Sequence, residues 1–130
     1  PSLMQETTLS AIGLITKVNE ILASLDLKDG LLAFKAINAK KEAVYPIFET
    51  YCRNLAITIL NLQTIFDMET FVLGGGISAQ SILIEEVNRQ FDKVHHEIDF
   101  IGKIIKRPKI VACHHNGTNL IGAAYFLKQG

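Results

Sequence analysis

The spacing of apolar residues predicts three helices in the first half of the chain. From Thr8 to Leu25, apolar residues recur every three or four positions with polar residues between them, which is typical of an amphipathic helix with one buried face. Asp29-Gly30 marks a break, and a second, shorter helix is predicted over Leu31 to Ile37, followed by the polar loop Asn38 to Lys41. The residues expected on the buried face of the first helix are Ala11, Leu14, Val18, Ile21, Leu22 and Leu25.

The longest predicted element runs from Glu42 to Ile65. Its apolar stripe widens beyond Leu55 until nearly every face is apolar, so we expect a helix buried on several sides at the centre of the core. Pro46 fits this helix if it lies in or near the first turn. The stripe consists of Val44, Phe48, Tyr51, Leu55, Thr58, Leu62 and Ile65.

The second half of the chain has a different pattern. Short apolar runs predict strands over Thr70 to Leu73 and Lys109 to His114, with helices over Ala79 to Val94 and Asn119 to Lys128. The segment from His95 to Pro108 has no clear pattern. In the helix between the strands, we expect Leu83, Val87, Phe91 and Val94 to be buried and Glu85, Glu86, Arg89 and Lys93 to be solvated.

These elements predict an α/β chain of three helices followed by β-α-β-α, with a small parallel sheet. A strand, a crossover helix and another strand normally form a right-handed parallel unit. We expect one domain over residues 1–130, with a helical region over 1–65 and the β-α-β-α region over 66–130. Because a two-stranded sheet is seldom stable alone, the sequence predicts a fragment whose other strands lie elsewhere, and a homodimer that hides the open edge.

The candidate ligand site is the glycine-rich stretch between the first predicted strand and the helix after it. Gly74, Gly75 and Gly76 carry no Cβ and tolerate positive φ angles, so a ligand could approach the backbone closely. Ser78 is expected to cap the following helix, whose first N–H groups would form an anion site. The same pattern also occurs where a strand and a helix only need to pack tightly.

Composition excludes several classes of partner. Thirteen basic and thirteen acidic residues give a formal net charge of zero, so nothing favours nucleic acid or an anionic membrane surface. No apolar stretch approaches the roughly 20 residues that cross a bilayer. Cys52 and Cys113 stand alone and are expected to be free buried thiols, as in a reducing compartment such as the cytoplasm.

The titratable residues suggest no catalytic or metal centre. His95-His96 and His114-His115 are adjacent pairs, whose side chains diverge on a helix or a strand and do not chelate one ion. Asp67 and Glu69, like the Glu85-Glu86 pair, are expected to be solvated, and Tyr45 and Tyr51 to serve the core or an interface. No catalytic residue and no metal ligand is therefore assigned.

Four stretches in this order resemble the C-terminal part of the ROK family, which comprises repressors, open reading frames and sugar kinases. The resemblance rests on the end of the long helix over residues 55–62, the acidic turn over 66–69, the glycine run over 72–78 and the apolar segment over 119–124. It spans roughly the whole chain. Thr118-Asn119 departs from the Ala-Gly that many members carry before the last apolar helix.

The resemblance implies the distal part of the second lobe of an actin-like ATPase fold. Family kinases phosphorylate hexoses or N-acetylated amino sugars from ATP and Mg²⁺, and the Gly74-Gly75-Gly76 loop with Ser78 would lie along the nucleotide. The family's Asp-x-Gly-Gly-Thr loop, catalytic Asp, Glu-x-Gly-His motif and zinc cysteine cluster are all missing from this sequence. We therefore expect a fragment that is inactive alone, from a parent sugar kinase. The alternatives are a sugar-responsive ROK repressor and a non-catalytic oligomerisation module.

Overall fold

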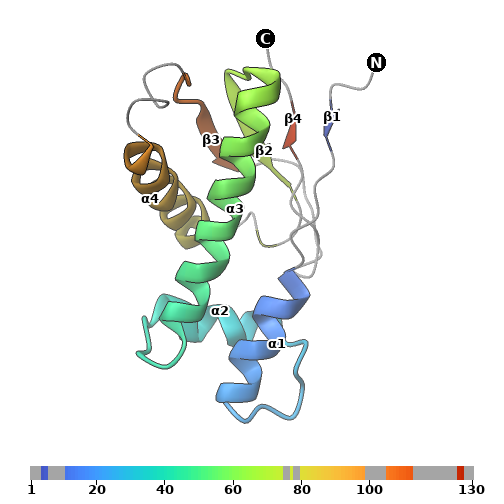
Figure 1. The fold of residues 1–130 in the computed structure, drawn as a ribbon. Helices are drawn as coiled ribbons and strands as arrows, with labels where there is room; N and C mark the ends of the chain where they lie inside the picture. The colour runs from blue at the N-terminus through green and yellow to red at the C-terminus, as the bar shows by residue number, and fades with distance from the viewer. Residues whose placement is uncertain are drawn as a thin grey trace.

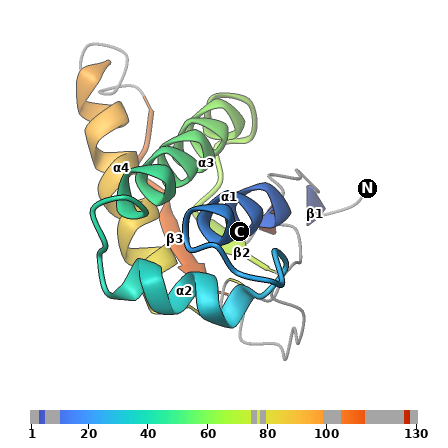
Figure 2. The same ribbon diagram turned by 90° about the horizontal axis from the view of Figure 1, so that it is seen from below.

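The long helix α3 is the centre of the molecule in the computed structural model. The structure describes residues 4–5, 11–74, 77, 80–98, 105–112 and 126–127. Helix α3 (Tyr45–Phe66) lies between α4 (Ser81–Glu97) on one side and α1 (Ala11–Ile21) on the other, as both views show (Figures 1 and 2). Helix α2 (Gly30–Asn38) packs against α1 at the lower end of the view in Figure 1.

The strands lie at the other end of α3. Strand β2 (Thr70–Leu73) pairs in parallel with β3 (Lys109–Ala112), with Thr70 opposite Lys109 and Leu73 opposite Ala112. Helix α4 is the crossover between them. Strand β1 (Met4–Gln5) pairs antiparallel with β4 (Phe126–Leu127), and β4 also contacts β2. The described residues thus form an α/β structure with four helices. The small parallel two-stranded sheet is as the sequence predicts.

The hydrophobic core joins all of these helices to β2. Fully buried side chains come from α1 to α4, and Phe34 of α2 meets Phe48 of α3 edge-on, with ring centroids 6.1 Å apart. The predicted buried residues of α4, including Val87 and Phe91, all lie in this core. Cys52 is buried and free, as predicted, whereas Cys113 lies outside the described residues.

A buried glutamine fixes the position of β2 relative to α3. Gln63, in the last turn of α3, is only 3% exposed. Its Nε2 donates to the carbonyl oxygens of Met68 and Lys106, each at 2.9 Å, and its Oε1 accepts from the Met68 N–H at 2.7 Å. One side chain therefore ties the end of α3 to the segments that lead into both parallel strands.

Several predicted boundaries are wrong, and turn geometry explains the first. Helix α1 ends at Ile21 rather than Leu25, because Ala23 adopts a left-handed φ of 54°. In that turn the N–H groups of Ala23 and Ser24 donate to the carbonyl oxygens of Glu20 and Asn19. Leu25 is consequently fully exposed instead of buried.

Helix α3 is shorter than predicted, and the residues that it buries near its C-terminal end differ from the predicted ones. It begins at Tyr45 rather than Glu42, and Pro46 lies in its first turn as expected. Its apolar face follows 3.6 residues per turn, so Ile59, Leu60 and Gln63 are buried near its end, whereas Ile65 is 71% exposed.

The last two elements also differ from the prediction. Helix α4 begins two residues later than predicted and continues through His95 and His96. Phe126–Leu127 is a strand rather than the end of a helix, because it finds a partner in β1 from the far end of the sequence. The residues between 113 and 125 lie outside the described part, and with them the ends of the predicted second strand and most of the predicted last helix. Among the described residues, no helix has the length and apolar character needed to cross a membrane.

Candidate functional site

The glycine loop begins at the carboxyl end of a buried parallel strand. Phe71, Val72 and Leu73 of β2 are buried, and Gly74, which follows them directly, is buried as well. Gly75, Gly76 and Ser78 lie outside the described residues. Ile77 is 1% exposed, so the loop is anchored in the core between its two ends. In open α/β sheets, ligands bind at this end of the strands.

The helix after the loop begins without a side-chain cap. Its N-cap is Gln80, in an extended conformation, so the prediction that Ser78 caps the helix is wrong. The Gln80 N–H donates to the carbonyl oxygen of Ile77 at 3.0 Å, and this turn delays the start of the helix to Ser81. The Leu83 N–H donates to the carbonyl oxygen of Gln80 at 3.0 Å in the first turn of α4, and the helix dipole favours negative charge beside this N-terminus.

A polar pocket opens beside the start of α4. Its volume is about 400 Å³, within the range of sites that hold small organic ligands. One wall is the face of α4 that begins at Ser81, and the opposite wall comes from the end of α2 and the start of α3. The lining residues are Asn38, Lys40, Tyr45, Ser81, Ile82, Glu85, Glu86 and Arg89. The spacing of Ser81, Glu85 and Arg89 along one helix face could have indicated this wall from the sequence.

A buried carboxylate organises the floor of this polar pocket. Glu86 is 4% exposed, so the prediction that it is solvated is wrong. Its oxygens accept hydrogen bonds from the Tyr45 hydroxyl at 2.8 Å, from the Arg89 guanidinium at 2.7 Å and from the Gln90 amide at 2.7 Å. Arg89 also binds Glu49 at 3.0 Å, which joins α3 to α4. Glu85 is exposed, as predicted.

These contacts keep Glu86 ionised. Burial raises the pKa of the carboxyl, but the hydrogen bonds from Arg89, Gln90 and Tyr45 outweigh burial and hold the pKa below its usual value. Burial, together with the bond to Glu86, raises the pKa of the Tyr45 hydroxyl, so this group stays a donor. A carboxylate that is saturated with donors is a structural anion and a poor general base.

The other predicted acid, base and metal candidates have structural or solvated positions. Asp67, with a left-handed φ of 47°, ends α3, and Glu69 is exposed, so both are solvated as predicted. His95 stacks on Phe91, with its Nε2 3.0 Å from the carbonyl oxygen of Ile105, while His96 is exposed. His114 and His115 lie outside the described residues. Within the described ranges, no three side chains of the His, Cys, Asp and Glu types come together as a metal site.

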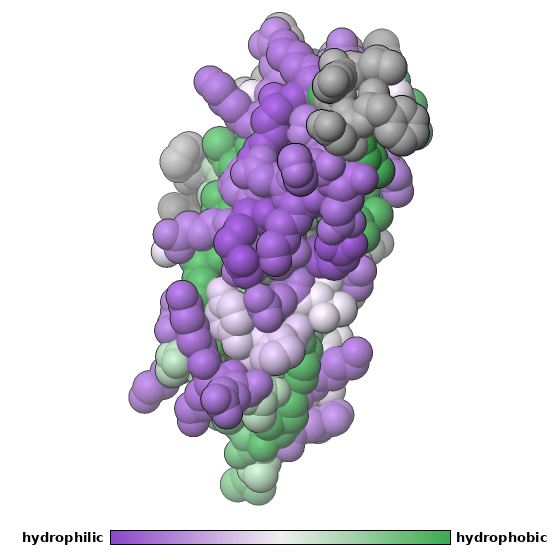
Figure 3. All heavy atoms as spheres, turned by 60° about the vertical axis from the view of Figure 1, so that its left-hand side comes forward, coloured by the Kyte–Doolittle hydropathy of each residue, from purple (hydrophilic) through white to green (hydrophobic). Residues whose placement is uncertain are grey.

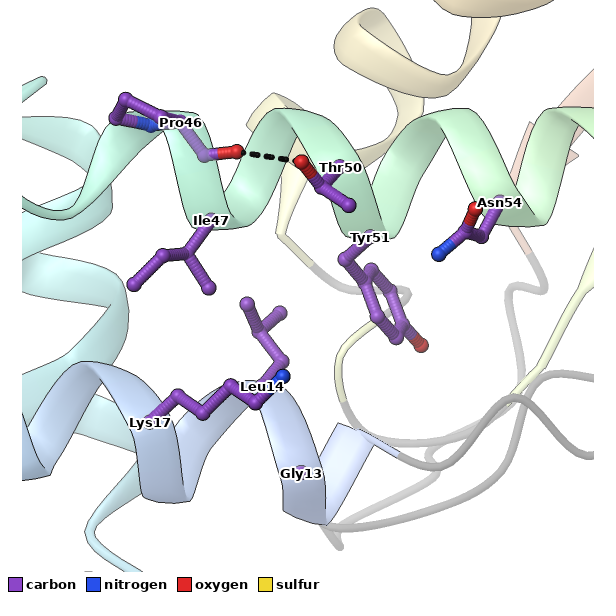
Figure 4. A pocket seen from close by; sticks show the side chains of 8 residues that line it. All are labelled: Gly13, Leu14, Lys17, Pro46, Ile47, Thr50, Tyr51 and Asn54. Carbon is purple, nitrogen blue, oxygen red and sulfur yellow. Dashed lines mark hydrogen bonds between the residues drawn. The ribbon is translucent and has the colours of Figure 1, made fainter.

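A second, larger pocket lies between α1 and α3. Its volume is about 490 Å³, and the close view shows Lys17 and Leu14 of α1 facing Ile47 and Tyr51 of α3 (Figure 4). The Thr50 hydroxyl donates to the carbonyl oxygen of Pro46 at 3.0 Å. The remaining lining residues are Gly13 and Asn54. Nothing in the sequence predicted this pocket, because it depends on how two helices cross.

The comparisons with known proteins place the chain in a family. The model of the ROK family matches residues 5–130. Neither the curated proteins nor the solved structures gave a match. The matched range contains both parallel strands, the glycine loop and α4, and the four stretches of sequence that resemble the family lie within it. This chain belongs to the ROK family.

Proposed function

We propose that this chain is the nucleotide-side part of a ROK-type sugar kinase. The family includes sugar kinases and repressors. The observation that carries the proposal is the position of the glycine loop, which leaves the carboxyl end of β2 and precedes the N-terminus of α4. In this proposal Gly74, Gly75 and Gly76, with Ser78, lie along ATP near the adenosine and the inner phosphates.

The polar pocket suits the adenosine part of such a ligand. Tyr45 and Ile82 offer apolar surface for a planar base, and Asn38 and Ser81 offer polar groups at its edge. The Asn38 amide is oriented by its bond to the carbonyl oxygen of Phe34 at 2.8 Å. Because the pocket begins at Ser81, a nucleotide could occupy it while its phosphates follow the loop.

The chemical step would depend on groups from other segments of the parent protein. Transfer of the γ-phosphoryl group to a sugar hydroxyl needs a base that activates the hydroxyl and Mg²⁺ on the phosphates. In the described part of the chain, the buried carboxylate Glu86 is saturated with donors, and no group of acidic or histidine side chains offers a metal site. We therefore assign this chain binding and positioning of the nucleotide, and expect the chain alone to be inactive.

Nucleotide titration of the full-length gene product tests the proposal. A fluorescent ATP analogue should bind, and Gly75→Val and Ser81→Leu should each weaken binding at least about tenfold, because both add side-chain volume where the ligand would lie. Ile65→Ser is the control. Ile65 is exposed at the C-terminal end of α3, whereas the polar pocket is lined by Tyr45 at the other end of the same helix. Unchanged affinity in both site variants would refute the assignment.

The kinase is distinguished from a repressor by a second experiment. The full-length protein is incubated with ATP and a panel of hexoses and N-acetylated amino sugars, and ADP release is measured. A kinase releases ADP with at least one sugar. A repressor would show no release, would carry a helix-turn-helix upstream of Pro1 in the gene, and would bind DNA in a sugar-dependent manner. A protein with neither property would leave the non-catalytic oligomerisation module.

A further inference from the structure

The pocket between α1 and α3 has the size and walls of a small-molecule site, and the proposed function does not use it. Its volume of about 490 Å³ lies within the range of sites that hold small organic ligands. In the close view, the side chains of Ile47 and Tyr51 extend from α3 toward α1, and that of Leu14 extends from α1 toward α3 (Figure 4). Both helices therefore give the pocket apolar walls, which suit a ligand with an apolar body.

Two polar side chains at this pocket have no partner in the described part of the chain. The Lys17 side chain runs along the pocket toward Leu14 (Figure 4), and among the described residues its ammonium group forms no ion pair. The side-chain amide of Asn54 makes no hydrogen bond there either, although its backbone carbonyl accepts from Thr58 at 3.0 Å. Lys17 thus offers a positive charge, and Asn54 offers N–H donors at the next part of the wall.

The other charges of the two helices do not neutralise this site. Helices α1 and α3 carry one carboxylate each, Glu20 and Glu49. Neither lines the pocket, and Glu49 binds Arg89 of α4 at 3.0 Å. The first turn of each helix borders the pocket and contains no acidic residue, so the helix dipoles also favour an anion. Among the described lining residues Lys17 is the only charged one, and a single negative charge matches it.

A glycine in the first turn of α1 leaves the wall of the pocket open. An added Cβ at Gly13 would meet no atom of the described part within 4 Å. Glycine disfavours a helix relative to alanine, and close packing in the described part does not require it here. Space for a ligand is a reason for this glycine. We propose that the α1–α3 pocket binds a small organic monocarboxylate, whose carboxylate pairs with Lys17 and whose apolar body lies between the two helices.

Ligand-detected NMR titration of the full-length gene product with 4-phenylbutyrate tests this site. The neutral analogue 4-phenylbutanol has the same apolar body. We expect saturable binding of the carboxylate, at least about tenfold tighter than that of the alcohol, because only the carboxylate pairs with the ammonium group. Lys17→Met keeps the stem of the side chain and removes its charge. It should weaken binding of the carboxylate at least about tenfold and leave binding of the alcohol unchanged.

Two further variants separate the shape of the pocket from its charge. Gly13→Met extends a side chain from the pocket wall; because its Cβ meets no described atom, the variant should fold and bind both ligands less tightly. Lys93→Met is the matched control for charge. Lys93 is exposed on α4, on the other side of α3, and the view toward α4 shows a largely hydrophilic surface (Figure 3). In thermal unfolding, 4-phenylbutyrate should raise the midpoint of the wild type and of Lys93→Met but not that of Lys17→Met.

Several results would overturn the proposal. One is a titration with 4-phenylbutyrate that shows no saturation at millimolar concentration. Equal affinities for the acid and the alcohol, or equal losses in Lys17→Met and Lys93→Met, would show that no carboxylate site exists here. Displacement of 4-phenylbutyrate by ATP would assign its binding to the proposed nucleotide site. The two sites are made of different residues and are titrated with different ligands, so this proposal and the proposed function can fail separately.

Discussion

Replacing Tyr45 by phenylalanine removes one hydroxyl from the buried network around Glu86. The ring keeps its contact with Phe48, whose centroid lies 5.6 Å away, so only the 2.8 Å bond to the carboxylate is lost. A hydrogen bond to a charged group contributes about 1.5–3 kcal/mol. Because Arg89 and Gln90 still bind Glu86, we expect the lower value, about 1.5 kcal/mol, and a fall in Tm of roughly 5 °C.

The pH dependence of the stability that Tyr45→Phe loses shows whether the lost bond to ionised Glu86 is the cause. The pKa of Glu86 in the folded protein lies below its unfolded value, so the stability from its ionised form is present above the unfolded pKa of about 4.3. That stability is lost as the pH falls through the folded-state pKa. The difference between the wild type and Tyr45→Phe should therefore be constant near neutral pH and narrow in acid.

Urea denaturation of a double-mutant cycle measures the effect. The four proteins are the wild type, Tyr45→Phe, Glu86→Gln and the double variant, and the free energy of unfolding is compared at neutral and acidic pH. We expect a coupling energy of about 1 kcal/mol at neutral pH. A loss that is independent of Glu86, or that persists unchanged in acid, would contradict the description of this network.

Three further predictions concern the scaffold. Gly13→Ala should raise the free energy of unfolding by about 0.5–1 kcal/mol in urea denaturation, because no atom of the described part lies within 4 Å of the added Cβ and alanine favours a helix. A loss of stability would contradict this and would indicate that other atoms occupy the pocket between α1 and α3. Gln63→Leu should destabilise by about 2–3 kcal/mol, because the Met68 N–H and two carbonyl groups lose their partner; a neutral result in thermal unfolding would contradict this. Cys52 should react slowly with a thiol reagent until the protein unfolds, because burial raises its pKa; equal rates in native and unfolded protein would refute it.

The apolar periodicity was sufficient to predict the order of the main elements. Helices α3 and α4 each bury one face over several turns, so the apolar spacing in the sequence is long enough to predict both helices. The run Thr70 to Leu73 is β2, as predicted. The parallel pairing of β2 with β3 followed from the crossover rule. These features depend on local patterns repeated over several turns.

The misplaced features depend on single residues or distant partners. Ala23 ends α1 in a left-handed conformation that glycine would have signalled and alanine does not. Glu86 is buried where Tyr45, 41 positions earlier, joins Arg89 and Gln90 in donating to its carboxylate. The pairing of β4 with β1 joins opposite ends of the chain. None of these leaves a periodic trace in the sequence.

The candidate site was predicted in part. The glycine run identified the loop, and Gly74 lies at the end of β2 as expected. The polar pocket was missed because its walls come from α2, α3 and α4, which tertiary packing brings together. The exposure of Leu25 was missed because the first helix was predicted to continue past Ala23, which would have placed Leu25 on its buried face.

Hydrogen–deuterium exchange of the full-length protein, with and without ATP, tests the central claim most directly. If the glycine loop and the start of α4 hold the nucleotide, a peptide that spans residues 74–83 should gain protection when ATP is added. A peptide from α1, which contains Gly13 and Lys17, should exchange at an unchanged rate and serves as the internal control. Protection of the α1 peptide alone, or no protection in either, would contradict the nucleotide assignment of Gly74 to Ser78.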